Sequence, residues 1–248
     1  MRSPIRSPLG NTKSLACLEE LIPKGSVVTS CNFFSGEIEF FLSNRDRFFN
    51  CKTTKHIIID CWRSIFEDPI AISEFASSLF PLKYEKEIGI IQENWSSYRS
   101  PQARAAIFYV LNNCTEQGWI SRGNIDLELL NPVLFSRLRR FRKPENIETV
   151  KAESVAELFD QDNVSDILFL RLPKVKINFL SEGLNVGVEE QKINFQSIYG
   201  KLRAKPHIIL TKPSDLLPLS DCEAIYIDKH GRTTSADNAK EIVIHNVR

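Results

Sequence analysis

The chain has 248 residues, of which 42% are hydrophobic and 25% are charged, so it carries enough apolar side chains for a packed core and is not a disordered chain. Its 32 lysines and arginines and its 31 aspartates and glutamates leave a formal net charge of +1. Net charge therefore indicates neither a nucleic-acid-binding protein nor an acidic one. This length fits one α/β domain with a small inserted lobe.

The six cysteines and four histidines are scattered along the chain, and none has the spacing of a metal site. The N-terminal sequence MRSPIRSPLG lacks the apolar segment of a signal peptide. No apolar run approaches the roughly 20 residues that a membrane-spanning helix needs. We therefore expect a cytoplasmic protein with free thiols, no metal and no membrane association.

The first third of the chain alternates between strand and helix patterns. We predict a helix from Thr12 or Ser14 to Pro23, a strand within 26–34, a helix over 36–44, a short buried strand over 55–60, and a helical stretch from 61 to 80 that breaks at Pro69. Such alternation is typical of parallel βαβ units.

The rest of the chain begins with helix formers and ends with strands. We predict helices around 100–113 and at about 189–201, strands within 164–179 and 202–211, and a closing antiparallel pair over 223–228 and 240–246. The segment NPVLF (131–135) contains Asn131-Pro132 with Phe135 nearby; we interpret it as a turn that starts with Asn-Pro, and the alternative is an imperfect NPP-aromatic motif.

Five segments, taken in chain order, carry a family resemblance. They are IRSPLGNTKSL (5–15), CNFFSGEIEFF (31–41), HIIIDCW (56–62), ILFLRLPKV (167–175) and KEIVIHN (240–246). They resemble, in layout more than in motif residues, the opening glycine-rich turn, the EPFFGGG loop, the IINDIN strand, the DPPY strand and the closing strand of the Dam-type DNA adenine methyltransferases. This resemblance covers nearly the whole chain.

The resemblance implies a fold and a cofactor site. The fold would be α/β, a doubly wound, Rossmann-like methyltransferase sheet with a helical inserted lobe, with ligands at the carboxyl ends of the strands. The core would comprise residues 1–74 and 161–248, and the target-recognition-like insert would comprise residues 75–160. The residues that match the family's S-adenosylmethionine site are Gly10, Phe33, Phe34, Gly36 and Asp60.

The loop that would hold the methionine end of the cofactor departs from the family pattern. Cys31 and Asn32 replace the first two residues of EPFF, and only Gly36 remains of three expected loop glycines. Glu37 places a negative charge near the cofactor's carboxylate, and like charges about 4 Å apart repel by roughly 4 kcal/mol at an effective dielectric constant of 20. The alternative is that Glu37 turns outward to solvent.

The DPPY position departs further, because it reads Arg171, Leu172, Pro173, Lys174. In the family, the first side chain and the backbone carbonyl that follows it accept hydrogen bonds from the target amine, and the aromatic residue stacks on a flipped base. Arginine has no acceptor atom, and lysine has no stacking face. The loss of one positioned hydrogen-bonding group costs about a hundred- to thousand-fold in rate, so we expect no catalysis.

Two further residues leave alternatives open. Asp60 matches the acid that holds the cofactor ribose, but an acid at this point is also typical of a helix N-cap. Trp62 replaces a small polar residue of the family pattern and is the candidate to fill the adenine pocket.

The segment SRLRRFRK (136–143) is the strongest remaining signal for nucleic acid. It concentrates five cations in seven residues: Arg137, Arg139, Arg140, Arg142 and Lys143. On a continuous helix, Arg139, Arg142 and Lys143 would share one face. Contact with phosphates is the functional interpretation; a solvated helix face, or a surface that docks an acidic protein, is the alternative.

Together these patterns predict a methyltransferase-like protein that has lost catalysis and binds DNA, another nucleic acid or a protein. We expect no cofactor, or S-adenosylmethionine if the pocket is still open. Two alternatives remain: an active S-adenosylmethionine-dependent DNA adenine-N6 methyltransferase with divergent motifs, and a structural subunit of a larger assembly.

Overall fold

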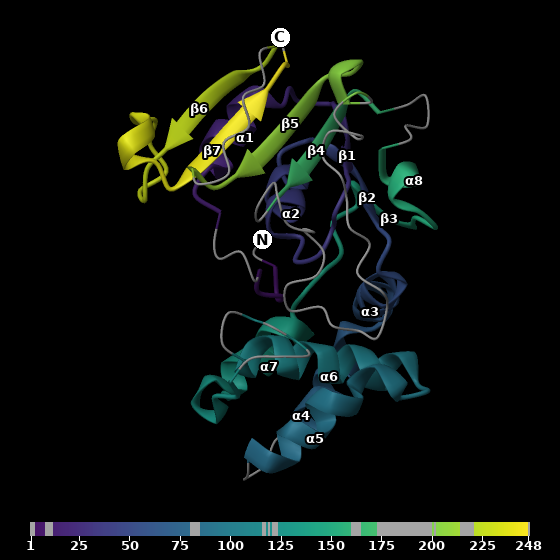
Figure 1. Cartoon of the computed structure of the whole chain (residues 1–248). Coiled ribbons are helices and arrows are strands. Elements are labelled where there is room, and N and C mark those ends of the chain that lie inside the picture. Colours follow the sequence, from purple (N-terminus) through teal and green to yellow (C-terminus); the bar gives the residue numbers. More distant parts are fainter. Residues whose placement is uncertain are drawn as a thin grey trace.

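A central sheet flanked by helices organises the chain, as the computed structural model shows (Figure 1). It describes residues 3–7, 12–79, 85–115, 118, 120, 124–159, 165–172, 200, 202–213 and 221–247. The sheet has seven strands in the order β3-β2-β1-β4-β5-β7-β6. All neighbouring strands are parallel except that β7 runs antiparallel to both β5 and β6. The fold is therefore α/β with a mostly parallel sheet.

The strands are short, and helices separate the first four of them along the chain. The strands are β1 (Val27–Ser30), β2 (Phe48–Thr53), β3 (Ile147–Lys151), β4 (Ile167–Arg171), β5 (His207–Thr211), β6 (Glu223–Ile227) and β7 (Glu241–His245). The helices are α1 (Leu15–Leu21), α2 (Glu37–Ser43), α3 (His56–Glu67), α4 (Pro69–Ser78), α5 (Glu85–Asn94), α6 (Pro101–Cys114), α7 (Pro132–Arg139) and α8 (Val155–Phe159), with 3-10 turns at Trp95–Ser97, Leu127–Leu129 and Ala236–Asn238.

The central strands are buried on both faces, and their side chains alternate between two hydrophobic cores. On β4, Ile167 and Phe169 join the larger core, whereas Leu168 and Leu170 join the smaller one. This alternation follows from the period of two residues along a strand. The near-continuous apolar sequence of β4 is what a strand covered by helices on both faces requires.

Helices α4, α5, α6 and α7 form a lobe beside the sheet (Figure 1). Helix α6 is buried along most of its length and packs against α3, α4 and α5. Two polar side chains join the helices, because Ser73 Oγ donates to the Phe135 carbonyl at 2.8 Å and Tyr109 Oη donates to the Leu134 carbonyl at 2.7 Å. The lobe therefore has a core continuous with that of the sheet.

Most of the expected elements are present where the sequence places them. The helices at 15–21 and 37–43, the break before Pro69, the apolar strands β4 and β5, and the antiparallel pair β6–β7 are confirmed. The helix expected at about 189–201 lies almost entirely outside the described residues. The range 75–160 expected for a helical insert contains α5, α6 and α7 and also β3, which belongs to the sheet.

The strand expected over 55–60 is wrong, because these residues begin helix α3. The preceding strand is β2, which the sequence analysis did not predict. Ile58, Trp62 and Ile65 fall on one face of α3 and are buried. Their spacing of four and three residues is that of a helix packed on a sheet, and it outweighs the strand preference of the isoleucine run.

Candidate functional site

The loop after β1 lies at the point where the strand order reverses, between β1 and β4. Its backbone continues the sheet on both sides: Cys31 N donates to the Phe169 carbonyl and Phe33 N donates to the Lys52 carbonyl, both at 2.9 Å. In an open α/β sheet, ligands bind outside the carboxyl ends of the strands at this reversal. The loop from 31 to 36 is therefore the first place to seek a ligand site.

Gly36 ends this loop in a left-handed conformation, with a φ angle of 68°. A Cβ atom added there would lie 2.6 Å from the ring of Phe40. Both the backbone conformation and the close ring therefore require glycine. Phe33 is buried and Phe34 is half-buried, so these aromatic residues of the loop pack inward.

Glu37, the first residue of α2, turns inward rather than outward to solvent. Its carboxylate accepts hydrogen bonds from the backbone N and the Oγ1 of Thr12, each at 3.0 Å. It also forms an ion pair with Arg171, with Oε2 lying 3.3 Å from Nη1. The side chains of Arg171 and Glu37 are only 12% and 22% exposed. An internal cation therefore neutralises the charge that the sequence analysis placed near a cofactor carboxylate.

Arg171 is the last residue of β4 and connects three segments. Its Nη1 donates to Ser7 Oγ at 3.0 Å as well as contacting Glu37. Its backbone N donates to Asn32 Oδ1 at 3.1 Å, and its carbonyl accepts from Asn32 Nδ2. Asn32 thus uses its amide group to extend the pairing of β1 with β4. The structure places Asn32, Glu37 and Arg171 together, whereas the sequence analysis treated them as separate defects.

The N-terminal segment covers the same loop. Ser3 Oγ donates to the Ser35 carbonyl. The backbone N of Arg6 donates to Asn112 Oδ1 at 2.6 Å, and Asn112 Nδ2 donates back to the Arg6 carbonyl at 3.0 Å. Ile5 is 3% exposed. This segment therefore lies against both the loop after β1 and helix α6. Gly10, Pro173 and Lys174, which the sequence analysis singled out, lie outside the described residues.

Trp62 is fully buried beneath the loop. Its Nε1 donates to the Phe34 carbonyl at 2.6 Å. Its ring lies 5.6 Å from that of Phe33 and 5.1 Å from that of Phe40, and the rings of Phe66 and Phe141 complete an aromatic cluster. Aromatic pairs at such distances stabilise a fold by more than the burial of their apolar area alone. Trp62 therefore holds the underside of the loop in place.

Asp60 does not lie at a strand end, because it is part of α3. Its carboxylate forms an ion pair with Lys151 of β3, with Oδ1 lying 3.0 Å from Nζ. The strand that does end beside the loop is β2, and it is followed by Thr54 and Lys55 rather than an acid. The end of β2 therefore carries no carboxylate of the kind that the resemblance led us to expect there.

Glu39 is a buried acid that the sequence analysis missed. It is 6% exposed, and its Oε1 accepts a hydrogen bond from Ser30 Oγ at 2.6 Å. Burial raises the pKa of Glu39, and the Ser30 hydrogen bond and the charge of Arg171 only partly oppose this rise. The only sequence signal was an acid inside the apolar helix segment EIEFF. Burial also raises the pKa of the Cys31 thiol, to about 12, so this loop cysteine is unreactive near neutral pH.

The five cations of 137–143 are all exposed, but Arg139, Arg142 and Lys143 do not share a helix face. Helix α7 ends at Arg139, so Arg142 and Lys143 lie beyond it, and the expected shared face is wrong. Arg139 forms an ion pair with Glu74 at 3.3 Å, whereas Phe141 is 3% exposed and packs in the aromatic cluster. The turn after α7 therefore anchors this segment through Phe141 and leaves its charges on the surface.

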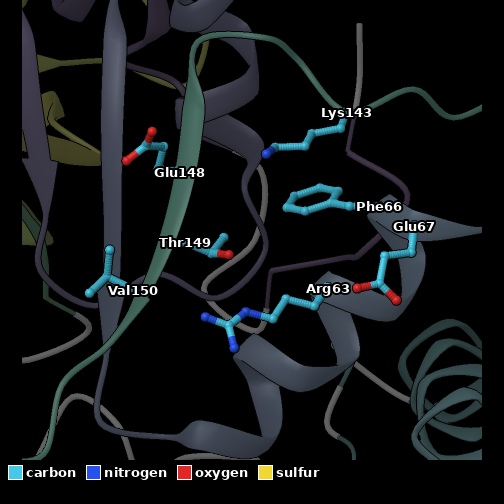
Figure 2. Close-up of a pocket in the computed structure, with 7 residues that line it drawn as sticks. All are labelled: Arg63, Phe66, Glu67, Lys143, Glu148, Thr149 and Val150. Carbon is cyan, nitrogen blue, oxygen red and sulfur yellow. The ribbon is translucent and has the colours of Figure 1, made fainter.

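A groove of about 460 Å³ lies next to this basic segment, between α3 and the edge strand β3 (Figure 2). Its lining residues are Arg63, Phe66, Glu67, Lys143, Glu148, Thr149 and Val150. The ammonium group of Lys143 lies 5.5 Å from the centre of the Phe66 ring. The groove is separate from the loop after β1 and combines two cations with an aromatic ring.

Within the described residues there is no group of three or more histidines, cysteines, aspartates and glutamates placed to hold a metal ion. None of the described helices has the length and apolar character needed to cross a membrane. A comparison with known protein families and with curated proteins finds no match to the chain. Its function must therefore be argued from its own residues.

Proposed function

We propose that this chain is a methyltransferase-like protein whose cofactor site is closed by its own side chains, and that it acts by binding nucleic acid. The observation that carries the first part is the ion pair between Glu37 and Arg171. Glu37 begins the helix directly after the loop that would receive the cofactor, and Arg171 stands at the position of the catalytic acceptor. Glu37 and Arg171 both depart from the family pattern, and their opposite charges neutralise each other.

The sheet supports the methyltransferase-like part of the proposal. Strands β3-β2-β1-β4-β5 follow the doubly wound order with the reversal between β1 and β4. One antiparallel strand, β7, is inserted between β5 and β6. A doubly wound sheet with a closing antiparallel pair is what the resemblance led us to expect. The order of the resembling segments does not depend on the motif residues that differ from the family. The order of the strands does not depend on them either.

The contacts around the loop support closure of the cofactor site. A ligand that entered beside Glu37 would have to displace its hydrogen bonds to Thr12 and its ion pair with Arg171. To leave either charge buried and unpaired is costly, because the charge has lost its hydration. From below, Trp62 holds the loop through its bond to the Phe34 carbonyl.

The loss of catalysis follows from the chemistry of Arg171. Its guanidinium group only donates hydrogen bonds, so it cannot accept one from an adenine amine. The other acceptor of the family motif is the backbone carbonyl of the following residue, which is Leu172 here. In this proposal, the side-chain acceptor that activates the amine is therefore lost.

Methyl transfer provides the direct test. Purified protein is incubated with labelled S-adenosylmethionine and adenine-containing DNA, beside an Arg171→Ala preparation made in the same way. The proposal predicts that neither preparation transfers label. Transfer by the wild-type protein that the Arg171→Ala preparation lacks would identify an active enzyme and overturn the proposal.

The exposed cations of 137–143 support the nucleic-acid part. Arg137 and Arg140 are exposed and form no ion pair among the described residues, so they are available to phosphates. Arg139 is partly neutralised by Glu74. Each phosphate contact releases counterions, so the affinity should fall steeply as salt rises.

Binding is tested by fluorescence anisotropy with labelled single-stranded and duplex DNA over a range of salt concentrations. Arg137→Gln and Arg140→Gln should each weaken binding and reduce the slope against log salt by about 0.7 to 0.9. Arg139→Gln should do less, and Lys229→Gln, which removes an exposed lysine remote in sequence, should do nothing. No binding to either DNA, or equal effects of all four variants, would contradict the proposal.

A further inference from the structure

We infer that the groove between α3 and β3 binds a nucleotide unit, with the base against Phe66 and the phosphate between Arg63 and Lys143. This inference rests on the proposed binding of nucleic acid and names the chemistry and the place of one contact. It assigns a site distinct from the loop after β1. The nucleotide is either part of a single strand or free in solution.

The size and position of the groove suit such a ligand. Its volume of about 460 Å³ lies within the range of about 300–1,000 Å³ that is usual for small-ligand sites. It begins at Lys143, the last cation of the basic segment. A strand bound at the basic segment would therefore meet the groove at Lys143.

The lining supplies both halves of nucleotide recognition. The Phe66 ring is half-buried, and its neighbour Phe141 stacks against it with an interplanar angle of 17° and a centroid distance of 6.1 Å. This contact fixes the orientation of the Phe66 ring. Aromatic rings held in this way form stacking surfaces for bases. Figure 2 shows the ring between Lys143 and Arg63 in this view, with the groove lined by all three.

The charged side chains of the groove suit the binding of one phosphate group rather than of the phosphate backbone of a longer strand. Arg63 and Lys143 are exposed, and Arg63 forms no ion pair among the described residues. Glu67 and Glu148 also line the groove, but neither carboxylate points toward the ammonium group of Lys143 (Figure 2). These two acids would repel further phosphates, and so they limit the groove to one nucleotide.

In the absence of ligand, Lys143 covers the ring that the base would use. A cation–π contact at an exposed site is weak, and the lysine side chain is long and flexible. When a base stacks on Phe66, the ammonium group can turn to the phosphate. Thr149, on the β3 side of the groove, offers a hydroxyl group that can donate to or accept from the ligand.

The test compares three variants of the full chain in anisotropy titrations with a labelled single-stranded oligonucleotide. Arg63→Gln removes a charge from an exposed position, and Phe66→Leu keeps an apolar side chain in place of the ring. Lys229→Gln is the control. Arg63→Gln and Phe66→Leu should each weaken binding about five-fold or more, and Arg63→Gln should also reduce the salt slope by about 0.7. Thermal unfolding of each variant checks that the fold is retained.

Competition separates the two sources of the nucleotide. If adenosine monophosphate displaces the strand and ribose phosphate does not, the groove recognises the base as well as the phosphate. If adenosine monophosphate binds in an Arg63-dependent way and no strand binds, the ligand is a free nucleotide; the groove inference then stands and the nucleic-acid proposal fails.

Other outcomes would overturn the inference. If the strand binds and responds to Arg140→Gln but not to Arg63→Gln or Phe66→Leu, the groove is not the site, although nucleic-acid binding stands. If an acidic peptide binds with the same dependence on Arg63 and none on Phe66, the partner is a protein. If neither strand nor nucleotide binds, both this inference and the proposed nucleic-acid binding are wrong.

Discussion

The two charged regions of this molecule use arginine in opposite ways. At the ends of β1 and β4, Arg171 is largely buried and contacts Glu37, Ser7 and, through its backbone, Asn32. Beyond α7, Arg137 and Arg140 are exposed. A buried paired charge fixes the structure around it, whereas an exposed charge contributes little to stability and is free to meet a partner. Arg171 is thus structural, and the exposed cations of 137–143 are the candidates for function.

The largest expected effect is at the aromatic cluster under the loop. Trp62→Ala should reduce the free energy of unfolding by about 3–5 kcal/mol, because it creates a cavity and leaves the Phe34 carbonyl without its donor. Urea denaturation measures the change. Val133→Ala, at a side chain that is 66% exposed, is the control and should change stability by no more than about 0.5 kcal/mol. Equal effects of the two would show that Trp62 does not support the loop.

Gly36→Ala should have the next largest effect on the free energy of unfolding. The substitution adds left-handed strain and places a methyl group against the Phe40 ring, with an expected loss of about 2–4 kcal/mol. Gly25→Ala provides a matched comparison, since Gly25 has a φ angle of 80° but no atom within 4 Å of an added Cβ. It should cost about 1–2 kcal/mol. If both variants lose the same stability, the close packing of Phe40 on the loop is not significant.

A double-mutant cycle sharpens the comparison at the ion pair itself. Glu37→Gln and Arg171→Met should each cost about 1–3 kcal/mol, because each removes the ion-pair partner of a largely buried charge. The double variant should be less destabilised than the two single effects predict, with a coupling of about 0.5–3 kcal/mol. Additive effects would mean that the two side chains do not stabilise each other.

Glu39 gives a pH-dependent prediction. Burial raises its pKa in the folded chain, so its contribution to stability is fully present below the unfolded pKa of about 4.3 and is lost as the pH rises through the folded pKa. The stability of Glu39→Gln relative to wild type should therefore increase from about pH 4 upward. Ser30→Ala removes a hydrogen bond that lowers this pKa, so the loss should begin at the same pH but continue to higher pH. A difference that is constant with pH would contradict this account.

The smallest effect on stability is expected in the basic segment. Arg140→Gln should change the free energy of unfolding by no more than about 0.5 kcal/mol, because the side chain is exposed. Chemical denaturation beside Arg171→Met measures the contrast directly. If Arg140→Gln is as damaging as Arg171→Met, the distinction between a structural and a functional arginine fails.

The sequence predicted elements well where the apolar pattern was unambiguous. The runs ILFLR and HIILT became β4 and β5, and EAIYI and EIVIH became the antiparallel pair β6–β7. The prediction was wrong at HIIID, because a run of β-branched residues is typical of a strand. The helical spacing becomes visible only with the later residues Trp62 and Ile65. The prediction also missed β2, whose sequence FFNCKT mixes apolar and polar residues because Phe48 is exposed and Lys52 is buried.

The site was harder to predict than the fold. Each substitution at Asn32, Glu37 and Arg171 was visible in the sequence, but their mutual contacts join positions more than a hundred residues apart. Pairing of this kind depends on the sheet order, which brings the end of β4 beside the end of β1. The groove at β3 was hidden for a similar reason, because the strand that forms one wall was itself not predicted.

Closure of the cofactor site is tested most directly by calorimetric titration with S-adenosylmethionine. The wild-type chain is compared with the double variant Glu37→Gly, Arg171→Asn, which removes both partners of the ion pair and restores family-like residues. The account predicts no binding by the wild-type protein at millimolar cofactor and measurable binding by the double variant. Micromolar binding by the wild-type protein would contradict it, because the ion pair would then leave the site open.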